Sequence, residues 1–546
     1  MARYDSRQDD ELLNHPPVLQ DYNVFATDQA LVGAVRREGA EWCEQRLLTF
    51  GKRCGSAELL EAGNLANRYP PELHTHDRFG HRLDEVRFHP AYHQLMQHVF
   101  NSGLHSLAWT AERPGAHVAH AAMVYMMAQT ETGVCCPAAM TYAAVPSLRT
   151  TPELADEWLP RILTQAYDGN FRPPAEKSAA TIGMAMTEKQ GGSDVRANTT
   201  RASAAGNDGE YLLNGHKWFC SAPMSDAFLT LAYIDDDLSC FLVPRWLPDG
   251  ERNCISIQRL KDKCGNRSNA SGEIEYHDTW GQLLGERGAG VRTIIEMVHH
   301  TRLDASLAPA GIMRQALVQA IHHARHRTVF QKKLVDQPLM ENVLADMALE
   351  VEAALLMVMR VARAFDEAQD DAAADAFSRI ATPVTKFWVN KRTPNLVYEA
   401  MECLGGGGYV EESILPRLYR EAPLNGIWEG SGNVITLDIL RALERNPQCG
   451  EAFVLELELA RGNDARFDTA LQSLTSDLRA GAVAQTSARA LAQQLALLLQ
   501  ASLMLRHAPA RGTAFCQLRL GDGGWVYGAN AGVDGAVEIL EHAWPD

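Results

Sequence analysis

The sequence lacks any run of about twenty uninterrupted apolar residues, the length that a helix needs to cross a bilayer. The most apolar stretch, residues 490–505, contains three glutamines and predicts a buried helix instead. The first residues, Met1 to Asp5, lack the apolar core of a secretory signal. We therefore expect a cytoplasmic protein that does not enter a membrane.

Closely spaced cysteine pairs, the usual mark of a structural zinc site, do not recur. The eleven cysteines are scattered and, with no export signal, indicate reduced thiols rather than disulfides. Histidines gather in two places, at His74, His76, His81 and His89 and at His322, His323 and His326. Because no cysteine or carboxylate completes a familiar ligand set, we expect core or surface histidines and no metal.

Positive charge is also scarce, since the formal net charge is −17. Such a chain favours solubility and disfavours attraction of its whole surface to nucleic acid or acidic membranes, although a local basic groove stays compatible with it. The apolar content of 46% and charged content of 22% are those of a globular protein. With 546 residues, several domains are expected.

The hydrophobic pattern changes three times along the chain. Residues 1–180 show helical spacing, as at 38–50 and 116–130. Residues 181–290 hold short β-branched runs between turn residues, which predict a small β domain. Its predicted features are a hairpin turn at Asn214-Gly215 and strands at 228–233 and 240–243.

Helical periodicity returns in residues 291–445, with long amphipathic stretches at 308–327 and 339–364. Residues 446–546 predict a further helical segment, with a glycine-rich loop at 521–532. The order predicts a mostly helical α+β fold. It comprises a helical N-terminal domain, a small middle β domain, a helical bundle and an extra C-terminal helical domain.

Two motifs in the β segment carry groups that suit a planar cofactor. In residues 186–194, MTEKQGGSD, two glycines permit close backbone approach and Ser-Asp supplies a hydroxyl and a carboxylate. In residues 214–221, NGHKWFCS, the aromatics are able to stack on a ring. A glycine-rich turn and a plain strand core are the alternative interpretations.

Three further motifs lie in the helical part. Residues 325–330, RHRTVF, place cations at a helix end, where they suit either capping or phosphate contact. Residues 405–408 are four glycines, whereas a helix stop needs only one. In residues 427–433, IWEGSGN, Glu429 is either a solvated loop residue or, if desolvated, a base for a carbon-bound proton.

Together, in this order, the five motifs resemble the acyl-CoA dehydrogenase family over residues 180–445. The resemblance implies FAD between the β domain and the bundle, partly covered by a second subunit, in a homotetramer. Position by position, it implies cofactor contacts at Met186, Thr187, Gly192, Ser193, Phe219, Ser221, Arg327, Phe330, Glu402, Gly405, Gly406, Ser431 and Asn433. Arg327 and Phe330 resemble the pair that a neighbouring subunit offers, and Glu402 stands where the family often has Gln.

The same resemblance implies that Glu429 is the catalytic base, which takes the α-proton of an acyl-CoA while the flavin accepts the β-hydride. Some members place the base just before the residue that matches Arg302, but Thr301 there has no carboxylate. Trp428 occupies a position that is commonly Tyr. We expect Trp428 and Arg302 in the substrate pocket and a pocket narrowed by the indole.

Residues 67–90, 260–271 and 418–433, and the extension after 445, resemble the AidB-like sub-branch. That implies weak dehydrogenase activity, double-stranded DNA binding and a role in the response to DNA alkylation. Residues 441–546 hold nine arginines, no lysine and twelve acidic residues, so DNA binding rests on the resemblance. Its candidate contacts are Arg441, Arg445, Arg506, Arg511 and Arg519. The alternatives are a DNA protector that retains a flavin site, or a metabolic short- or branched-chain dehydrogenase whose extension serves oligomerisation only.

Overall fold

The computed structural model describes residues 14–481, 483–521, 523–530 and 532–544. The chain forms two compact units. We call residues 58–304 the sheet unit, and residues 1–57 with 305–546 the bundle unit. Helix α9 (Gly290–His326) contributes its first turns to the sheet unit and the rest to the bundle unit.

The sheet unit begins with helices and a hairpin. Its helices are α3 (Ala57–Arg68), α4 (Pro90–Asn101), α5 (Leu107–Thr110), α6 (Ala116–Thr130), α7 (Cys135–Leu148) and α8 (Pro152–Ile162). Every residue of α6 is buried, so this helix is apolar all round and forms core, which confirms the predicted helix at 116–130. Only helices were expected before residue 181, yet β1 (Glu72–His76) and β2 (Arg82–Arg87) pair antiparallel.

That hairpin is held by a polar contact with the main sheet, which the local sequence does not reveal. The backbone N–H of Ile257 donates to Asp84 at 3.2 Å, and the Arg82 guanidinium donates to the Ile257 carbonyl at 3.0 Å. Both partners of the hairpin lie more than 170 residues from Ile257 in the chain. Pairing at such a distance is invisible to a local pattern.

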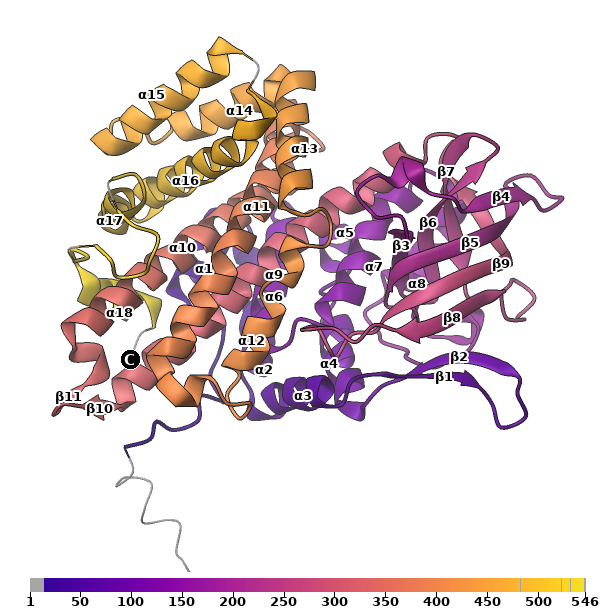
Figure 1. Cartoon of the computed structure of the whole chain (residues 1–546), viewed down its shortest axis with the longest axis horizontal. Helices are drawn as coiled ribbons and strands as arrows, with labels where there is room; N and C mark the ends of the chain where they lie inside the picture. Colours follow the sequence, from indigo (N-terminus) through magenta and orange to yellow (C-terminus); the bar gives the residue numbers. More distant parts are fainter. Residues whose placement is uncertain (1–13, 482, 522, 531, 545–546) are drawn as a thin grey trace, which may run out of the picture. The chain divides into compact units, whose positions relative to one another are not determined.

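The main sheet has seven strands in the order β3-β5-β4-β6-β7-β9-β8 (Figure 1). They are β3 (Ile182–Thr187), β4 (Arg201–Ala204), β5 (Glu210–Ser221), β6 (Ala227–Ile234), β7 (Asp237–Pro244), β8 (Ile255–Leu260) and β9 (Ser271–Leu284). Further pairings of β3 with β6 and of β5 with β9 close a ring of five strands. Its interior is apolar, with Phe228, Phe241 and Tyr276 among the buried residues.

The predicted hairpin turn at Asn214-Gly215 is wrong. Strand β5 runs through both residues, and the register shifts between Leu213 and Gly215 mark a bulge. A glycine suits this point because its φ is +153° and a Cβ there would lie 2.5 Å from the Thr200 hydroxyl. The chain instead reverses before β5, at Gly206 and Gly209, both with positive φ.

Among the residues that the structure describes, the bundle unit is built from α-helices, short 3₁₀ helices and a small hairpin. Its helices are α1 (Gln29–Arg37), α2 (Glu44–Cys54), the later part of α9, α10 (Pro338–Glu367), α11 (Ala372–Leu404), α12 (Leu415–Glu421) and α13 (Gly432–Arg445). The predicted helix at 38–50 is correct only in its second half, because residues 39–43 form a turn and a short 3₁₀ helix. The helices expected at 308–327 and 339–364 are confirmed within α9 and α10.

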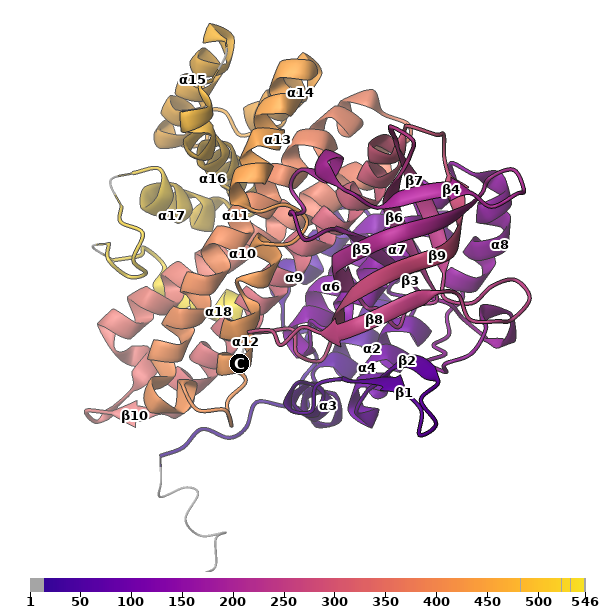
Figure 2. The same cartoon turned by 45° about the vertical axis from the view of Figure 1, so that its right-hand side comes forward.

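The C-terminal extension packs as a helical layer on α10 and α11 (Figure 2). It comprises α14 (Pro447–Glu458), α15 (Ala465–Ala480), α16 (Ala488–His507), α17 (Pro509–Arg519) and α18 (Ala536–Ala543). Helix α16 is long and apolar enough to span a membrane by composition, but 78% of that window is buried within the protein. Burial of this kind is typical of a core helix. The predicted mostly helical α+β fold, with its β domain in the middle, is confirmed.

Candidate functional site

Strands β3 and β5 bring together three of the residues predicted to hold a flavin. Thr187 of β3 is paired with Phe219 of β5, and Met184 with Ser221. The Phe219 ring is 50% exposed, which is unusual for a large apolar side chain on a sheet. An exposed ring between two hydroxyl-bearing residues forms a platform on which a planar group can stack and accept hydrogen bonds.

The glycine motif adjoins this platform. A Cβ on Gly192 would lie 2.5 Å from the Thr187 hydroxyl oxygen, so only glycine lets the two segments approach this closely. Met186 uses its backbone carbonyl to accept a hydrogen bond from Asn198, at 3.2 Å. Ser193 is exposed on the same loop. These residues therefore lie together at the C-terminal end of β3.

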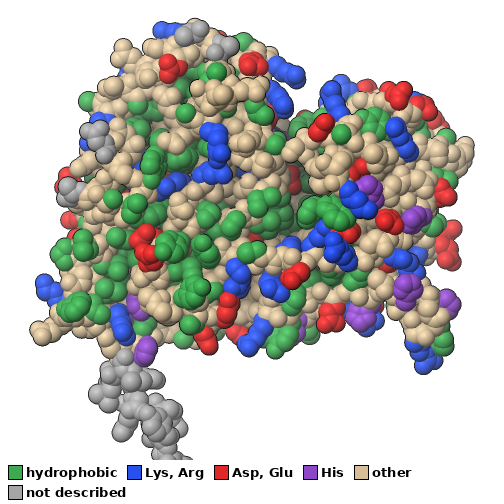
Figure 3. Space-filling view, viewed as in Figure 1, with side chains coloured by type: hydrophobic (Ala, Val, Ile, Leu, Met, Phe, Trp, Pro, Cys, Tyr) green, Lys and Arg blue, Asp and Glu red, His purple; other side chains and the backbone are tan. Residues whose placement is uncertain are grey.

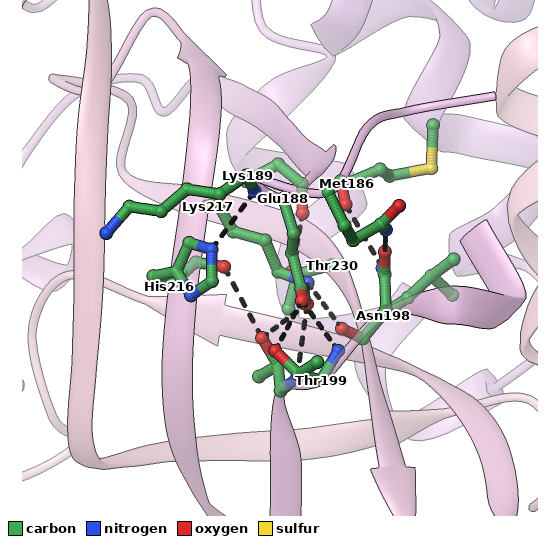
Figure 4. Close-up of polar contacts among 12 residues, drawn as sticks. Met186, Glu188, Lys189, Asn198, Thr199, His216, Lys217 and Thr230 are labelled. Atoms are coloured by element: carbon green, nitrogen blue, oxygen red, sulfur yellow. Dashed lines mark hydrogen bonds and ion pairs between the residues drawn. The ribbon is translucent and has the colours of Figure 1, made fainter. Parts of the chain in front are cut away.

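A buried ion pair joins the segments that carry Thr187 and Phe219 (Figure 4). Glu188 and Lys217 are both fully buried, and the Lys217 Nζ donates to the Glu188 carboxylate at 2.9 Å. Lys217 also donates to the Leu231 carbonyl at 2.8 Å. The carboxylate accepts four more hydrogen bonds, from the backbone N–H and hydroxyl groups of Thr199 and Thr200.

This network determines the charge state of its acid. Burial raises the pKa of the Glu188 carboxyl, but the Lys217 ammonium and the accepted hydrogen bonds outweigh burial and hold this pKa at about 2. Burial lowers the pKa of the Lys217 ammonium, and Glu188 opposes that change. Glu188 lies within the motif at 186–194 and Lys217 within the motif at 214–221, so the ion pair joins the two motifs. This pair was not predicted, although each strand-like motif contains one of its charged residues.

Positive charge flanks the exposed ring. The Lys261 Nζ lies 3.6 Å from the centre of the Trp218 ring and 4.6 Å from that of Phe219. Lys189 and Arg259 also approach Trp218, at 5.6 Å and 5.7 Å. Glu273 neutralises part of this charge because it accepts from Arg259 and Lys261. The platform therefore has an electropositive border that suits an anionic ligand.

In the bundle unit, Glu429 lies on a strained loop. We call residues 425–430 the base loop; it begins within a short 3₁₀ turn (Leu424–Gly426) and leads into α13. Glu429 has a φ of +56° and Gly430 a φ of +103°, both in the left-handed region. For a non-glycine residue this conformation costs about 1–3 kcal/mol and is typical of functional sites. The Glu429 side chain is half-buried.

Two side chains hold the base loop. The Trp428 indole N–H donates to the Asn425 side-chain oxygen at 2.7 Å. Lys386 of α11 is buried, and its Nζ donates to the backbone carbonyls of Asn425 and Gly430, each at 2.9 Å. The two accepted carbonyls bracket Glu429. Lys386 was not predicted as a functional residue. It lies within a long helix, and the carbonyls that it bonds are about 40 residues further along the chain, where a local pattern does not reveal them.

The glycine run ends α11 in an open place. Gly405 has a φ of +61°, and a Cβ on Gly405, Gly406 or Gly407 would meet no atom within 4 Å. At Gly408, by contrast, an added Cβ would lie 2.5 Å from the Met401 carbonyl oxygen. Three of the four glycines thus border free space, which is compatible with close approach of a ligand.

The remaining predicted cofactor contacts of the bundle unit are exposed. Glu402 is exposed, and a hydrogen bond with it raises the pKa of Tyr398. Ser431 and Asn433 are exposed at the start of α13. Arg302, expected in the substrate pocket, is buried on α9.

Arg327 and Phe330 lie at the small hairpin of β10 (Thr328–Val329) and β11 (Lys332–Lys333). Phe330 is 93% exposed and has a φ of +48°, although it is a bulky aromatic residue. The Arg327 guanidinium donates to the Asn14 carbonyl at 2.9 Å. The chain thus presents an aromatic ring outward from a strained turn.

Three of the five arginines proposed for DNA are engaged in ion pairs within the bundle unit. Arg519 is buried against Asp346 and Glu350, with its nearest nitrogen 2.5 Å from Asp346. Arg511 pairs with Glu352, and Arg506 with Glu456, each at 2.6 Å. A phosphate would have to compete with these carboxylates. The expectation of DNA contact is therefore not supported for these three, whereas Arg441 and Arg445 are exposed on α13.

Metal ligands do not gather in the part of the chain that the structure describes. No group of three His, Cys, Asp or Glu side chains there is arranged to hold an ion. All eleven cysteines lie in this part and are free thiols.

Three family models match consecutive parts of the chain. The model of the Adaptive response protein AidB N-terminal domain matches residues 14–169. The models of the acyl-CoA dehydrogenase middle domain and C-terminal domain match residues 183–279 and 288–444.

Curated relatives and solved structures agree with these matches. The chain is 48% identical to the putative acyl-CoA dehydrogenase AidB of Escherichia coli (strain K12), over 94% of this chain and 95% of that protein. It is 31% identical to acyl-CoA dehydrogenase family member 11 of Caenorhabditis elegans, over 78% of this chain and 71% of the relative. The crystal structure of Caenorhabditis elegans ACDH-11 in complex with C11-CoA superposes with a TM-score of 0.85 at 27% identity, covering 96% of this chain and 95% of that one.

Proposed function

The chain belongs to the acyl-CoA dehydrogenase family, in its AidB-like branch, and from this premise we propose that Glu429 is its catalytic base. The resemblance inferred from the five motifs is thereby confirmed, and with it an FAD-dependent oxidoreductase. The observation that carries the proposal is the placement of Glu429 on a strained, cross-braced loop. A left-handed φ is uncommon for a residue other than Gly, Asn or Asp, so the loop holds Glu429 in a conformation that few glutamates adopt.

The residues of the sheet unit fit a flavin. The exposed Phe219 ring offers a stacking surface, Thr187 and Ser221 offer hydroxyls, and Gly192 leaves room for the backbone to approach. The electropositive border at Lys261 suits the anionic parts of FAD. When bound, FAD supplies the acceptor for the hydride from the substrate β-carbon.

Glu429 contributes the proton step of the reaction. Oxidation of an acyl-CoA across its α and β carbons needs a base for the α-proton, which is only weakly acidic. The half-buried Glu429 carboxylate accepts this proton. Substitution of Glu429 by Gln keeps the shape and removes the base.

Acyl-CoA is the proposed substrate, because the related ACDH-11 was solved with C11-CoA. The indole of Trp428 is fixed by Asn425 beside the base, so it narrows the space for an acyl chain. We therefore propose short or branched acyl groups and poor oxidation of palmitoyl-CoA.

The direct test is the absorbance spectrum of the purified protein, recorded anaerobically before and after addition of isovaleryl-CoA. We expect the flavin of the wild type to bleach and that of Glu429→Gln to stay oxidised while it remains bound. A flavin that no acyl-CoA bleaches would contradict the enzymatic proposal. Equal bleaching of both proteins would exclude Glu429 as the base.

A second proposed function is the AidB-type role in the response to DNA alkylation, with binding of double-stranded DNA by a cytoplasmic protein. The observation in its favour is that the match to AidB spans 94% of this chain and so reaches into the C-terminal extension. Arg441 and Arg445 are its exposed cations. The alternative is a metabolic dehydrogenase whose extension builds the oligomer. Gel shifts at several salt concentrations, with an Arg441→Glu/Arg445→Glu variant as control, separate the two.

We also propose a homotetramer. Figure 3 shows hydrophobic side chains gathered on the surface of the bundle unit. Large apolar side chains exposed on this unit include Phe330, Tyr398, Tyr409, Tyr419 and Ile427. Apolar surface of this kind favours burial against another copy. Light scattering of the wild type and of Phe330→Ser would test the assignment, since loss of the ring should weaken the assembly.

A further inference from the structure

The base loop depends on one buried ammonium group. Lys386 projects from α11, is only 2% exposed, and donates from Nζ to the carbonyls of Asn425 and Gly430. We propose that Lys386 is the positioning residue of the base loop. It joins the two ends of the loop and thereby fixes where the Glu429 carboxylate points. The proposal rests on the function proposed above for Glu429.

The geometry explains why the loop needs such a brace. Two successive residues, Glu429 and Gly430, have left-handed φ, a conformation that a free loop leaves readily. The two accepted carbonyls belong to the first and last residues of the loop. A single ammonium that bonds both of them keeps the ends at a constant separation. The residues between them, including Glu429, then have little freedom to rotate.

The anchor itself is rigid. The side-chain amide of Asn390, one turn further along α11, donates to the Lys386 backbone carbonyl at 2.8 Å. The same side-chain amide also donates to the Ala305 carbonyl at 2.9 Å. Helix α11 is thus bonded to α9 at the turn that carries the lysine. A side chain on a fixed helix positions a reactive group more precisely than a side chain on another loop.

Lysine chemistry suits this position better than its alternatives. An ammonium has three donors that rotate to reach acceptors in different directions, and a charged donor forms stronger bonds with carbonyl oxygen. Methionine has almost the same shape but donates nothing. Arginine keeps the charge and the donors at a larger size. Lys386→Met therefore removes the brace, and Lys386→Arg tests whether donors alone restore it.

The decisive measurement is hydrogen–deuterium exchange of the full-length protein, read in peptides that cover residues 424–431. We expect faster exchange there in Lys386→Met and unchanged exchange in β3 of the sheet unit. The matched control is Lys52→Met, the same substitution at an exposed lysine of α2. Lys386→Arg should return part of the protection.

The second readout is anaerobic flavin reduction by isovaleryl-CoA. A base displaced by about 1 Å loses roughly 100-fold in rate, so the limiting rate constant should fall by about that factor in Lys386→Met. The Kd for isovaleryl-CoA should change much less than the rate, because the lysine bonds backbone carbonyls of the base loop. A lysine that merely stabilised the bundle would not separate the rate from the affinity in this way.

Unchanged exchange in residues 424–431 would overturn the proposal, whatever the rates. If the wild-type flavin is not reduced by acyl-CoA, the proposed function fails, while the exchange data still decide the role of Lys386. Should Lys386→Met fail to fold, Lys386→Gln, which keeps a donor but not the charge, provides the same readouts. Loop exchange equal to that of the wild type in that variant would overturn the need for an ammonium.

Discussion

The two predicted halves of the site are each held by a buried lysine, and the two lysines work differently. Lys217 of the sheet unit neutralises a buried carboxylate, Glu188, that also accepts four other hydrogen bonds. Lys386 of the bundle unit instead bonds two backbone carbonyls of a strained loop. The first contact pairs two charges, whereas the second braces neutral groups.

The difference teaches what each contact contributes. Loss of one partner of a buried ion pair leaves an uncompensated charge and costs about 3–5 kcal/mol of stability. Loss of a donor to a backbone carbonyl leaves a neutral acceptor and costs about 1–3 kcal/mol. Lys217 should therefore matter most for folding of the sheet unit, and Lys386 for the geometry of the base loop.

The largest effect is expected from breaking the ion pair. Lys217→Met leaves the Glu188 carboxylate buried without its ammonium, so the free energy of unfolding should fall by about 3–5 kcal/mol. Chemical denaturation followed by circular dichroism would measure the change. Lys52→Met, at an exposed lysine, is the matched control and should change stability little.

The double variant Glu188→Leu/Lys217→Met sharpens this test. It removes both charges and keeps apolar volume, so it should recover a large part of the stability that Lys217→Met loses. Strictly additive losses would contradict the interpretation of the contact as a coupled ion pair.

A second effect should appear as a pH dependence. The pKa of Glu188 is about 2 in the folded protein and 4.5 ordinarily, so folding lowers this pKa. The contribution of Glu188 to the free energy of unfolding is fully present above about pH 4.5. It is lost as the pH falls toward the pKa of the folded protein. The stability difference between wild type and Glu188→Gln should therefore narrow as the pH is lowered through this window.

Urea unfolding of both proteins between about pH 2 and pH 6 would measure that difference. A difference that stays constant across the window would contradict the depressed pKa. The bundle unit offers the contrast, because Lys386→Met does not remove the Glu188 carboxylate and should leave this dependence unchanged.

Much of this arrangement followed from the sequence. The helix–sheet–helix order came from hydrophobic periodicity, and β6 and β7 lie where short apolar runs predicted strands. The positions of Thr187, Phe219 and Ser221 on paired strands agree with their assignment to one site, although that assignment stays a prediction. Local patterns suffice where the residues of a feature are close in the chain.

The failures share one cause. Asn214-Gly215 has the composition of a turn, but pairing of β5 with β9 makes it a bulge, and Thr200, just before β4, lies close to Gly215. Arg519 was named as a candidate DNA contact, yet it pairs with Asp346, 173 residues away in the chain. Lys217 and Lys386 escaped notice for the same reason. Tertiary partners decide these outcomes, and no local pattern records them.

The smallest expected effect concerns the indole beside the base. Asn425→Ala removes the oxygen that accepts from the Trp428 N–H at 2.7 Å, while the backbone carbonyl that Lys386 binds remains. Because the indole is half-buried, the loss should cost only about 1 kcal/mol of stability. The freed ring should admit longer acyl chains, so flavin reduction by octanoyl-CoA should rise relative to isovaleryl-CoA.

Trp428→Phe tests the same bond from its other end. A double-mutant cycle with Asn425→Ala should give a coupling of about 1 kcal/mol, which is the value of a single neutral hydrogen bond. If the chain-length preference is the same in both single variants and the wild type, the indole does not narrow the pocket. The preference is expected to broaden in both single variants and to stay unaltered in Lys386→Met. That result would show that two separate contacts position the base and the indole, because Lys386 bonds the loop backbone and Asn425 bonds the ring.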